Sequence, residues 1–369
     1  MLANLMLGSQ ESVEPLPAVR PGGVREAIDE VLVAALSRPP CVVSFSGGRD
    51  SSGVLALATD VARRHGLPLP VPVTMRFAGV GAAEEADWQE LVLGHLGLSN
   101  REVLDLTDEL DALGPAATTF LGRHGVRWPG NAYMHRPVIE LARGGTVLTG
   151  IGGDELFSNN SPRRSARQLA VGALPRRLRA EVWLARRRPF GYGWLTPLGR
   201  ARMCRALAQD EVSWPHRWDR SVHHWHMSRA FAAMNATLAL VADGTEVDVV
   251  NPFMNSQVLA ELARAGGARG FPSRTHAMHY LCAGLLPDAL MSRQTKASFG
   301  GAVWGEATRG FMSAWEGGGV DRSYVDGPRL RGEFAKEEPD FRTILLVHQV
   351  WVHAHELSSA TSRAICTSS

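Results

Sequence analysis

The segment with the clearest chemical potential is Ser46–Ser52, which reads Ser-Gly-Gly-Arg-Asp-Ser-Ser. Gly47 and Gly48 allow the backbone to turn tightly and to approach a ligand closely, so that backbone N–H groups can point at an anion. The serines add hydroxyl donors, and a helix beginning here would direct its N-terminal dipole at the same anion. A carboxylate is a poor direct contact for phosphate. We therefore interpret Asp50 as a ligand for Mg²⁺, which binds phosphate oxygens on its other side.

A simpler interpretation of this segment is a capped helix after a glycine turn, because Ser and Asp are good N-cap residues. Other common nucleotide-binding loops do not fit the sequence. A Walker A loop requires Gly-Lys-Ser/Thr, but neither of the two lysines, Lys296 and Lys336, follows a glycine. No G-x-G-x-x-G segment follows an expected strand, and Ser46 does not lie in a G-x-S-x-G sequence.

The elements that must position this loop show an alternating pattern in the first 150 residues. Short apolar runs predict buried strands, and the segments between them have helical spacing. We expect strands at 41–45, 71–77, 102–106 and 145–149, and helices at 24–37, 52–65, 84–97, 107–122 and 131–143. Strands that alternate with helices predict an α/β fold with a doubly wound parallel sheet. From about residue 160 to 295 helical patterns dominate.

Four motifs together carry a resemblance to a known family. Ser46–Ser52 resembles the SGGxDS signature of the PP-loop ATP pyrophosphatases, α/β enzymes that cleave ATP to AMP and pyrophosphate. Three more segments, in matching order, are similar to the synthetase domain of asparagine synthetases. Thr149–Phe157 looks like its G-x-G-x-D-E-L-F segment, Val249–Asn255 is similar to V-R-V-P-F-L-D, and Leu286–Phe299 is similar to L-P…R-x-K…F. The chain is therefore identified as a member of an asparagine-synthetase-like family over about residues 24–305.

The resemblance implies a role for each site residue. Asp50 and Asp154 would hold Mg²⁺ against the phosphates of ATP, since both follow neighbouring strands at their carboxyl ends. The rest of the ATP site would be formed by Ser46, Gly47, Gly48, Ser51 and Ser52 around pyrophosphate, and by Ser44, Met75, Thr149 and Gly152. Lys296 would neutralise charge that develops at the α-phosphate and at the acyl carbon, a contribution of about 3–4 kcal/mol.

Two departures from the family pattern change these expectations. Glutamine-dependent asparagine synthetases begin with a cysteine nucleophile and carry a glutaminase domain, whereas residue 2 here is Leu2 and about 40 residues precede the loop. We therefore expect the nitrogen to come from free ammonia, a partner's product or a substrate amine. Ile151 stands where the family has an acidic residue, or a tyrosine in β-lactam-forming members, and it cannot accept a proton. Glu155 is a candidate general base, with a structural role as the alternative.

These departures suit the branch of the family that joins amines to carboxylates in natural-product assembly, which includes β-lactam synthetases and lasso peptide cyclases. The sequence Arg293–Lys296, Arg-Gln-Thr-Lys, looks most like the cyclases. We therefore expect an AMP- and pyrophosphate-forming carbon–nitrogen ligase that makes an acyl-adenylate, with macrolactam formation as the leading reaction. The alternatives are a PP-loop RNA-modifying enzyme, an ammonia-dependent asparagine-synthetase-like enzyme and a noncatalytic binding partner.

Charge and composition narrow the range of partners. The formal net charge is +2, but Arg163–Arg188 contains nine arginines and one acidic residue, Glu181. This block predicts a basic surface for a partner protein or a leader peptide, with a solvated helical surface as the alternative. We expect no nucleic-acid partner, because the four cysteines form no pair with zinc-site spacing. No secretory signal or membrane-spanning run is present, so we expect a cytoplasmic protein.

These patterns divide the chain into four expected parts. An irregular N-terminal arm at 1–22 precedes a PP-loop ATP-binding α/β core at 23–158. A mainly helical substrate region at 159–355 follows and carries the catalytic lysine segment. The tail at 356–369 is rich in serine and threonine and is expected to be flexible.

Overall fold

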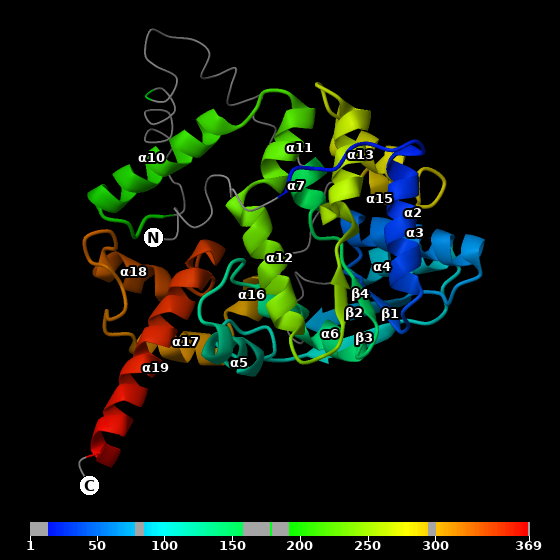
Figure 1. Ribbon diagram of the computed structural model, residues 1–369. Helices are drawn as coiled ribbons and strands as arrows, with labels where there is room; N and C mark the ends of the chain where they lie inside the picture. The colour runs from blue at the N-terminus through cyan, green and yellow to red at the C-terminus, as the bar shows by residue number, and fades with distance from the viewer. Residues whose placement is uncertain (1–13, 78–84, 158–177, 179–191, 294–299, 368–369) are drawn as a thin grey trace.

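A five-stranded parallel sheet forms the centre of the computed structural model, which describes residues 14–77, 85–157, 178, 192–293 and 300–367 (Figure 1). The strands are β1 Cys41–Ser44, β2 Val71–Phe77, β3 Glu102–Leu106, β4 Thr146–Leu148 and β5 Asp248–Val250. Every pair of neighbours is parallel, in the order β3-β2-β1-β4-β5. The expectation of an α/β fold with a parallel sheet is confirmed.

The order of the strands places a topological switch point between β1 and β4. From β1 the chain moves outward through β2 to β3, and then returns to place β4 on the other side of β1. Val42 of β1 accordingly lies opposite Val71 on one side and Val147 on the other. In open α/β sheets ligands bind outside the carboxyl ends of the strands at such a point. The two segments with predicted chemistry directly follow β1 and β4.

Helices cover both faces of the sheet. The α-helices of its first half are α2 Gly23–Leu36, α3 Arg49–His65, α4 Ala86–Leu96, α5 Pro115–His124, α6 Arg136–Leu141 and α7 Gly153–Phe157. The later α-helices are α10 Pro197–Ser213, α11 Trp218–His226, α12 Arg229–Ala242, α13 Ser256–Gly266, α14 Arg274–Cys282, α15 Asp288–Met291, α16 Gly300–Val303, α17 Glu306–Ala314, α18 Gly327–Phe334 and α19 Ile344–Thr367. Three 3-10 helices are η2 Ala132–His135, η3 Pro252–Met254 and η4 Phe341–Thr343.

The alternation of side chains along β1 explains why helices are needed on both faces. Val43 packs into the largest core, together with α2, α3 and α13. Val42, which points to the other face, packs with Val147 and with residues of α6 and α12. Because both faces are covered, the strands read in the sequence as continuous apolar runs.

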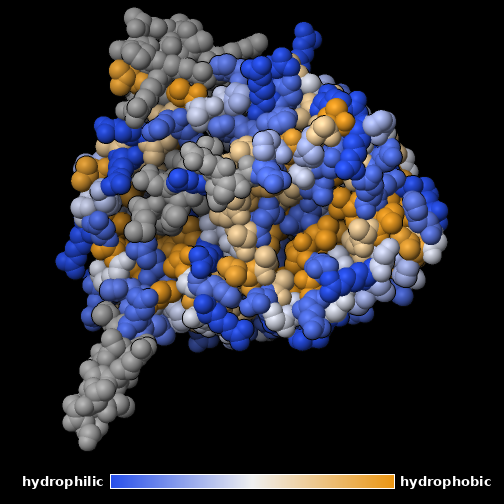
Figure 2. Space-filling model, viewed as in Figure 1, coloured by the Kyte–Doolittle hydropathy of each residue, from blue (hydrophilic) through white to orange (hydrophobic). Residues whose placement is uncertain are grey.

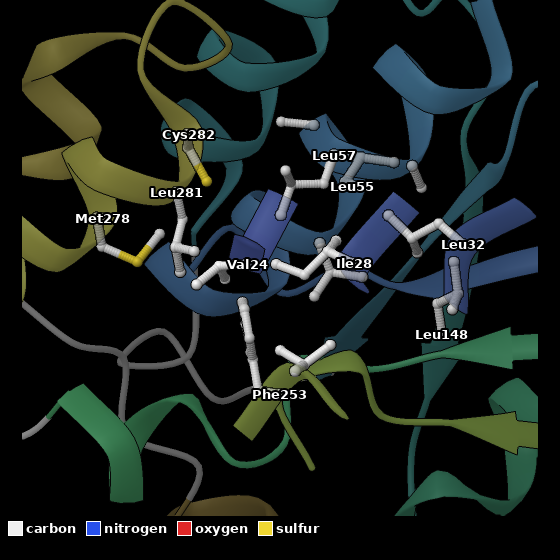
Figure 3. Packing of buried hydrophobic residues seen from close by; sticks show 14 of the residues in the cluster. Val24, Ile28, Leu32, Leu55, Leu57, Leu148, Phe253, Met278, Leu281 and Cys282 are labelled. Atoms are coloured by element: carbon white, nitrogen blue, oxygen red, sulfur yellow. The ribbon is translucent and has the colours of Figure 1, made fainter. Parts of the chain in front are cut away.

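The largest core fixes α3, the helix that begins within the Ser46–Ser52 loop. Ile28 and Leu32 of α2 are completely buried against α3, and Met278 and Leu281 of α14 close the same cluster (Figure 3). Burial of a side chain of this size contributes about 1.5–3 kcal/mol. A Cβ on Gly53 of α3 would lie 3.1 Å from Cε of Met278, so α14 packs closely on α3 near its start. The N-termini of α3 and α14 are thereby held in a fixed relation.

A second apolar core lies between α5, α17, α18 and α19, and it includes Trp194, Trp304 and Trp315. The end of α19 projects from the body of the molecule (Figure 1). Polar side chains cover much of the visible face, with apolar residues gathered in patches between them (Figure 2). Within the described ranges, no helix combines the length and the apolar character needed to cross a membrane.

The structure differs from the sequence-based expectations in three elements. The strand β5 was not predicted, because three residues within a helical region carry no readable period. The helix expected at 107–122 begins only at Pro115, where the fixed φ of proline suits the first helical turn. The tail expected to be flexible from residue 356 is helical as far as Thr367, since extending an existing helix costs little.

Candidate active site

The loop after β1 has the shape expected of an anion-binding loop. Gly47 adopts a φ of 83°, a left-handed conformation that favours glycine, and α3 begins two residues later. The Ser51 hydroxyl donates to the Gly48 carbonyl at 3.1 Å and accepts from the Ser46 backbone N–H at 3.3 Å. Ser46 itself is exposed. The loop is therefore braced from within, and the residues that begin α3 directly after it are half-buried or buried.

The second loop follows β4 and is braced by Thr149. The Thr149 hydroxyl accepts from the Ile151 backbone N–H at 3.1 Å and donates to the Asn251 side-chain oxygen. The backbone N–H of Thr149 donates to Val250 of β5 at 3.1 Å. Gly152 has a φ of 97°, and a Cβ there would lie 2.8 Å from Cγ of Met254. The turn that leads into α7 therefore requires glycine at position 152.

Two further glycines allow the loops to touch each other. A Cβ on Gly153 would lie 2.4 Å from Cγ of Asp50, and a Cβ on Gly150 would lie 2.7 Å from the backbone nitrogen of Ser51. Real Cβ atoms essentially never make such short contacts. Any side chain at these positions would push the second loop away from the start of α3. The Gly-x-Gly-Gly pattern is thus explained by close backbone approach and by the turn.

Asp50 and Asp154 both accept hydrogen bonds from the guanidinium group of Arg274. Arg274, the first residue of α14, donates through Nη1 to Oδ1 of Asp154 at 2.5 Å and through Nη2 to Oδ2 of Asp50. We call these three residues the loop triad. Burial lowers the pKa of Arg274, but its two carboxylate partners more than offset that effect and raise the pKa on balance. Two aspartates that are distant in the sequence therefore lie at one guanidinium group, and their sharing of Mg²⁺ stays a prediction.

The donor set of the loop triad fits a magnesium ion. Mg²⁺ is usually held by one or two carboxylates together with substrate phosphates, and not by a cage of protein ligands. Asp50 and Asp154 supply two carboxylates that already point at one positive group beside the N-terminus of α3. Among the described residues, no group of three or more His, Cys, Asp or Glu side chains could hold a metal ion.

Buried charges from α4 and from the segment after α15 support the same loop. Glu85 and Arg293 form a bidentate ion pair whose side chains are only 6% and 5% exposed. The Arg293 guanidinium also donates to the Gly47 carbonyl at 3.4 Å and stacks 4.7 Å from the ring centre of Trp88. Gln89 donates to the Ser46 carbonyl at 3.3 Å. These contacts fix the backbone of the loop from the side opposite to β4.

The comparison with known proteins agrees with this geometry. A family model described as Asparagine synthase matches residues 23–338, which is most of the chain. The protein belongs to the asparagine synthase family. This asparagine synthase family member is therefore an ATP-dependent ligase that forms carbon–nitrogen bonds of the amide type. A search of curated proteins finds no matching relative.

The remaining predicted residues of this family member lie in different surroundings. Ser44 is half-buried at the end of β1, and Met75 packs near the end of the neighbouring β2. Ser52 is fully buried, and its hydroxyl has no hydrogen-bond partner among the described residues. Glu155 is exposed on the first turn of α7, and Ile151 packs against the largest core.

Two predictions fall outside the part of the chain that the structure describes. Lys296 belongs to residues 294–299, and the arginine block at 163–188 falls outside except for Leu178. Two residues of the site, Arg274 and Glu85, were missed by the sequence reasoning. A single arginine in an arginine-rich chain gives no signal, and Glu85 pairs with a residue 208 positions away. Only the tertiary structure brings them to the loop.

Proposed function

We propose that the protein activates a carboxylate with ATP and Mg²⁺ as an acyl-adenylate and then transfers the acyl group to an amine. The observation that carries this proposal is the loop triad, in which Asp50 and Asp154 converge on one positive group. The convergence occurs beside the N-terminus of α3, where a triphosphate would bind. Family membership supports the ATP-dependent amide chemistry, and the triad supports a site for a metal ion and the phosphates of ATP.

The loop would act on the phosphate end of the reaction. A carboxylate oxygen of the substrate attacks the α-phosphorus, and the bond to the β-phosphate oxygen breaks to release pyrophosphate. Asp50 and Asp154 would hold Mg²⁺, which supplies neutralisation of phosphate charge when bound. Burial, together with the nearby Arg274, lowers the pKa of Arg49, while Asp50 and Asp154 act in the opposite direction. The backbone of Gly47 and Gly48 would bind the departing pyrophosphate.

Lys296 would act on the acyl end of the reaction. It lies outside the described residues, and in the sequence it follows Arg293 by three positions. The Arg293 guanidinium donates to the Gly47 carbonyl at 3.4 Å. A lysine in reach of the α-phosphate and the acyl carbon would stabilise the negative charge that develops when the amine attacks. The amine then loses a proton, and AMP leaves. Glu155, exposed next to Asp154, is our candidate for accepting that proton.

The substrate we propose is a peptide or natural-product precursor that contains both the carboxylate and the amine, so that the product is a macrolactam. Two features support this choice over aspartate. Ile151 packs in the core where the family has a polar or acidic residue, and Arg293–Lys296 resembles the lasso peptide cyclases. The arginine block at 163–188 would bind the acidic part of such a precursor or a partner protein.

The experiment that tests the proposal is a pyrophosphate-release assay with candidate acids. Peptides with an Asp or Glu side chain and a free N-terminal amine are compared with aspartate plus ammonia. The proposal predicts pyrophosphate, AMP and a peptide product lighter by one water. Activity with aspartate and ammonia alone would favour the ammonia-dependent alternative. If neither the peptides nor aspartate plus ammonia led to ATP turnover, the proposed substrate class would be contradicted.

The role of Lys296 is tested separately with the two lysines of the chain. Lys296→Ala should lower pyrophosphate release by about 10²–10³-fold, which corresponds to the loss of one preorganised charge. Lys336→Ala is the matched control, because Lys336 is exposed on the surface and pairs with Glu333 at 2.6 Å. A Lys296→Ala variant that releases pyrophosphate at the wild-type rate would contradict the assignment.

A further inference from the structure

Arg274 is fixed in place by the helix that it begins. The Ser273 side chain caps α14 by accepting from the His276 backbone N–H at 3.2 Å. Further along α14, Met278 and Leu281 are buried in the largest core beside α3 (Figure 3). The Arg274 side chain is only 16% exposed. Its guanidinium is therefore held between the two loops by packing as well as by charge.

The guanidinium is incompletely satisfied in this position. Nη1 and Nη2 donate to Asp154 and Asp50, but the buried Nε of Arg274 has no hydrogen-bond partner among the described residues. A buried donor without a partner is unfavourable, because it has lost its hydrogen bond to water. The contact between Arg274 and the two carboxylates therefore leaves a polar group that an additional anion would satisfy.

We propose that Arg274 is a positioning residue that takes the place of the divalent cation between Asp50 and Asp154 in the nucleotide-free protein. This inference rests on the proposed function, because it assumes that these carboxylates hold Mg²⁺. A guanidinium and a divalent cation compete for the same oxygens, so the nucleotide-free protein binds divalent cations weakly. Mg²⁺ then enters together with ATP, whose phosphates supply further ligands for the metal and an anion for the displaced guanidinium.

The arrangement would serve two purposes. Before ATP binds, Arg274 keeps two like charges together, although like charges alone would repel each other. After ATP binds, the same positive charge lies next to the triphosphate. The order of binding follows, with Mg²⁺ and ATP entering as a complex and not one after the other.

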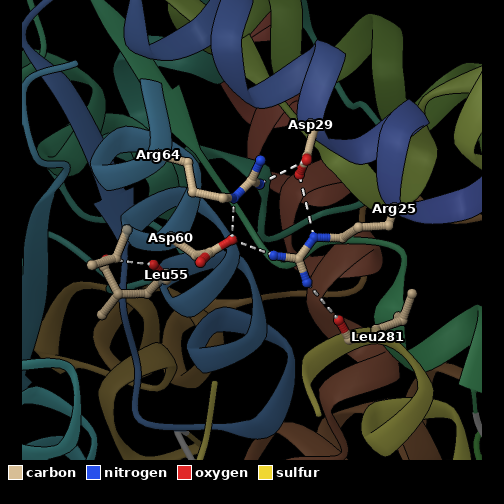
Figure 4. A network of polar contacts seen from close by, with 7 residues as sticks. Arg25, Asp29, Leu55, Asp60, Arg64 and Leu281 are labelled. Carbon is tan, nitrogen blue, oxygen red and sulfur yellow. Dashed lines mark hydrogen bonds and ion pairs between the residues drawn. The ribbon is translucent and has the colours of Figure 1, made fainter. Parts of the chain in front are cut away.

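Titration of the nucleotide-free protein with Mn²⁺, followed by the electron paramagnetic resonance signal of the free ion, tests this inference. Arg274→Met removes the competing charge and should tighten Mn²⁺ binding by about tenfold or more. The Mn²⁺ affinity of Arg274→Lys should lie between those of Arg274→Met and the wild type. A lysine keeps the positive charge, but its single ammonium group lacks the planar guanidinium that spans two carboxylates. Arg25→Met is the matched control, since Arg25 also bridges two aspartates but at the outer surface (Figure 4).

The outcomes separate this inference from the proposed function. If Arg274→Met folds and binds Mn²⁺ no more tightly than the wild type, the inference is overturned. If Arg274→Met does not fold, an Mn²⁺ affinity of Arg274→Lys equal to that of the wild type overturns it instead. The wild type is also titrated in the presence of a nonhydrolysable ATP analogue, with and without Asp154→Asn. Loss of Mn²⁺ binding on this substitution supports the metal site, whatever Arg274 does. An Mn²⁺ affinity that is the same with and without Asp154→Asn would overturn the proposed metal site itself.

Discussion

Two clusters of arginine and aspartate in this protein have the same chemistry and different surroundings. The first, which we call the outer network, joins α2 to α3 through Arg25, Asp29, Asp60 and Arg64 (Figure 4). Its ion pairs measure 2.5–3.3 Å, and its side chains are 18–43% exposed. The second is the loop triad, in which Asp50 and Arg274 are each 16% exposed and Asp154 is 48% exposed.

The difference lies in what brings each cluster together. In the outer network both helices are packed by their apolar faces, and the ion pairs form where those helices meet the solvent. In the loop triad the three side chains come from three separate elements, and two glycines without room for a Cβ bring the loops into contact. The outer network lies at the surface, where an exposed ion pair contributes about 0–1 kcal/mol to the free energy of unfolding. The loop triad lies at the switch point of the sheet, where charge can act on a ligand.

The largest expected difference between the clusters is in catalysis. Asp154→Asn should lower pyrophosphate release by about 10²–10³-fold, because the metal loses one of its two carboxylates. Asp60→Asn makes the same change in the outer network and should leave the rate within about twofold. Both rates are measured with the same acid substrate at saturating ATP. If both variants lost the same fraction of the rate of pyrophosphate release, the loop triad would have no catalytic role that distinguishes it from the outer network.

A large effect on stability is expected where the loop is supported by buried charge. Glu85→Gln leaves Arg293 buried without its bidentate partner, which should lower the free energy of unfolding by about 3–5 kcal/mol. Glu30→Gln breaks the exposed pair with Arg20 and should cost less than about 1 kcal/mol. Urea denaturation of both variants checks the prediction, and a similar cost for the two would contradict it.

The close contact between the two loops can be tested by adding one methyl group at Gly153. Gly153→Ala places a Cβ against Asp50 and should lower the free energy of unfolding by about 1–3 kcal/mol, because the second loop must move. The same shift should weaken the binding of a fluorescent ATP analogue with Mg²⁺. Gly122→Ala is the control, since a Cβ there meets open space in α5 and should stabilise that helix by up to about 1 kcal/mol. An unchanged nucleotide affinity in Gly153→Ala would argue against the close approach.

The smallest effect is expected in the outer network itself. Arg25→Met removes contacts to Asp29 and Asp60 but leaves Arg64 in place, so the free energy of unfolding should fall by less than about 1 kcal/mol. Thermal unfolding in low and high salt is the measurement. A loss of several kcal/mol that salt does not reduce would mean that this network is a buried structural element and not a surface one.

The sequence predicted the sheet and the meeting of the aspartates for a common physical reason. Strong apolar runs define β1 and β4, and in a parallel sheet the residues that follow adjacent strands must lie at the same edge. The short strand β5 escaped prediction, since its pairing with β4 depends on the β4 ladder and not on its own three residues. Local pattern was sufficient for β1 and β4, which stand between clear helical segments, but not for β5 within a helical region.

The supporting charges could not be predicted in the same way. Arg274 reaches Asp50 across 224 positions, and Arg293 reaches Glu85 across 208, so no local spacing links the partners. Packing of α14 on α3 decides the first contact, and the position of α4 beside the loop decides the second. The sequence therefore indicated the residues that we propose to bind the ligand, but it did not indicate the charged residues that support them.

The most direct test of the account is a double-substitution cycle on the two carboxylates. The affinity for Mn²⁺ in the presence of a nonhydrolysable ATP analogue is measured for the wild type, Asp50→Asn, Asp154→Asn and the variant with both changes. If one cation is held by both side chains, each single change removes most of the binding, and the second adds little to the first. Losses that simply add, or a variant that retains wild-type affinity, would show that the two aspartates do not share a metal ion.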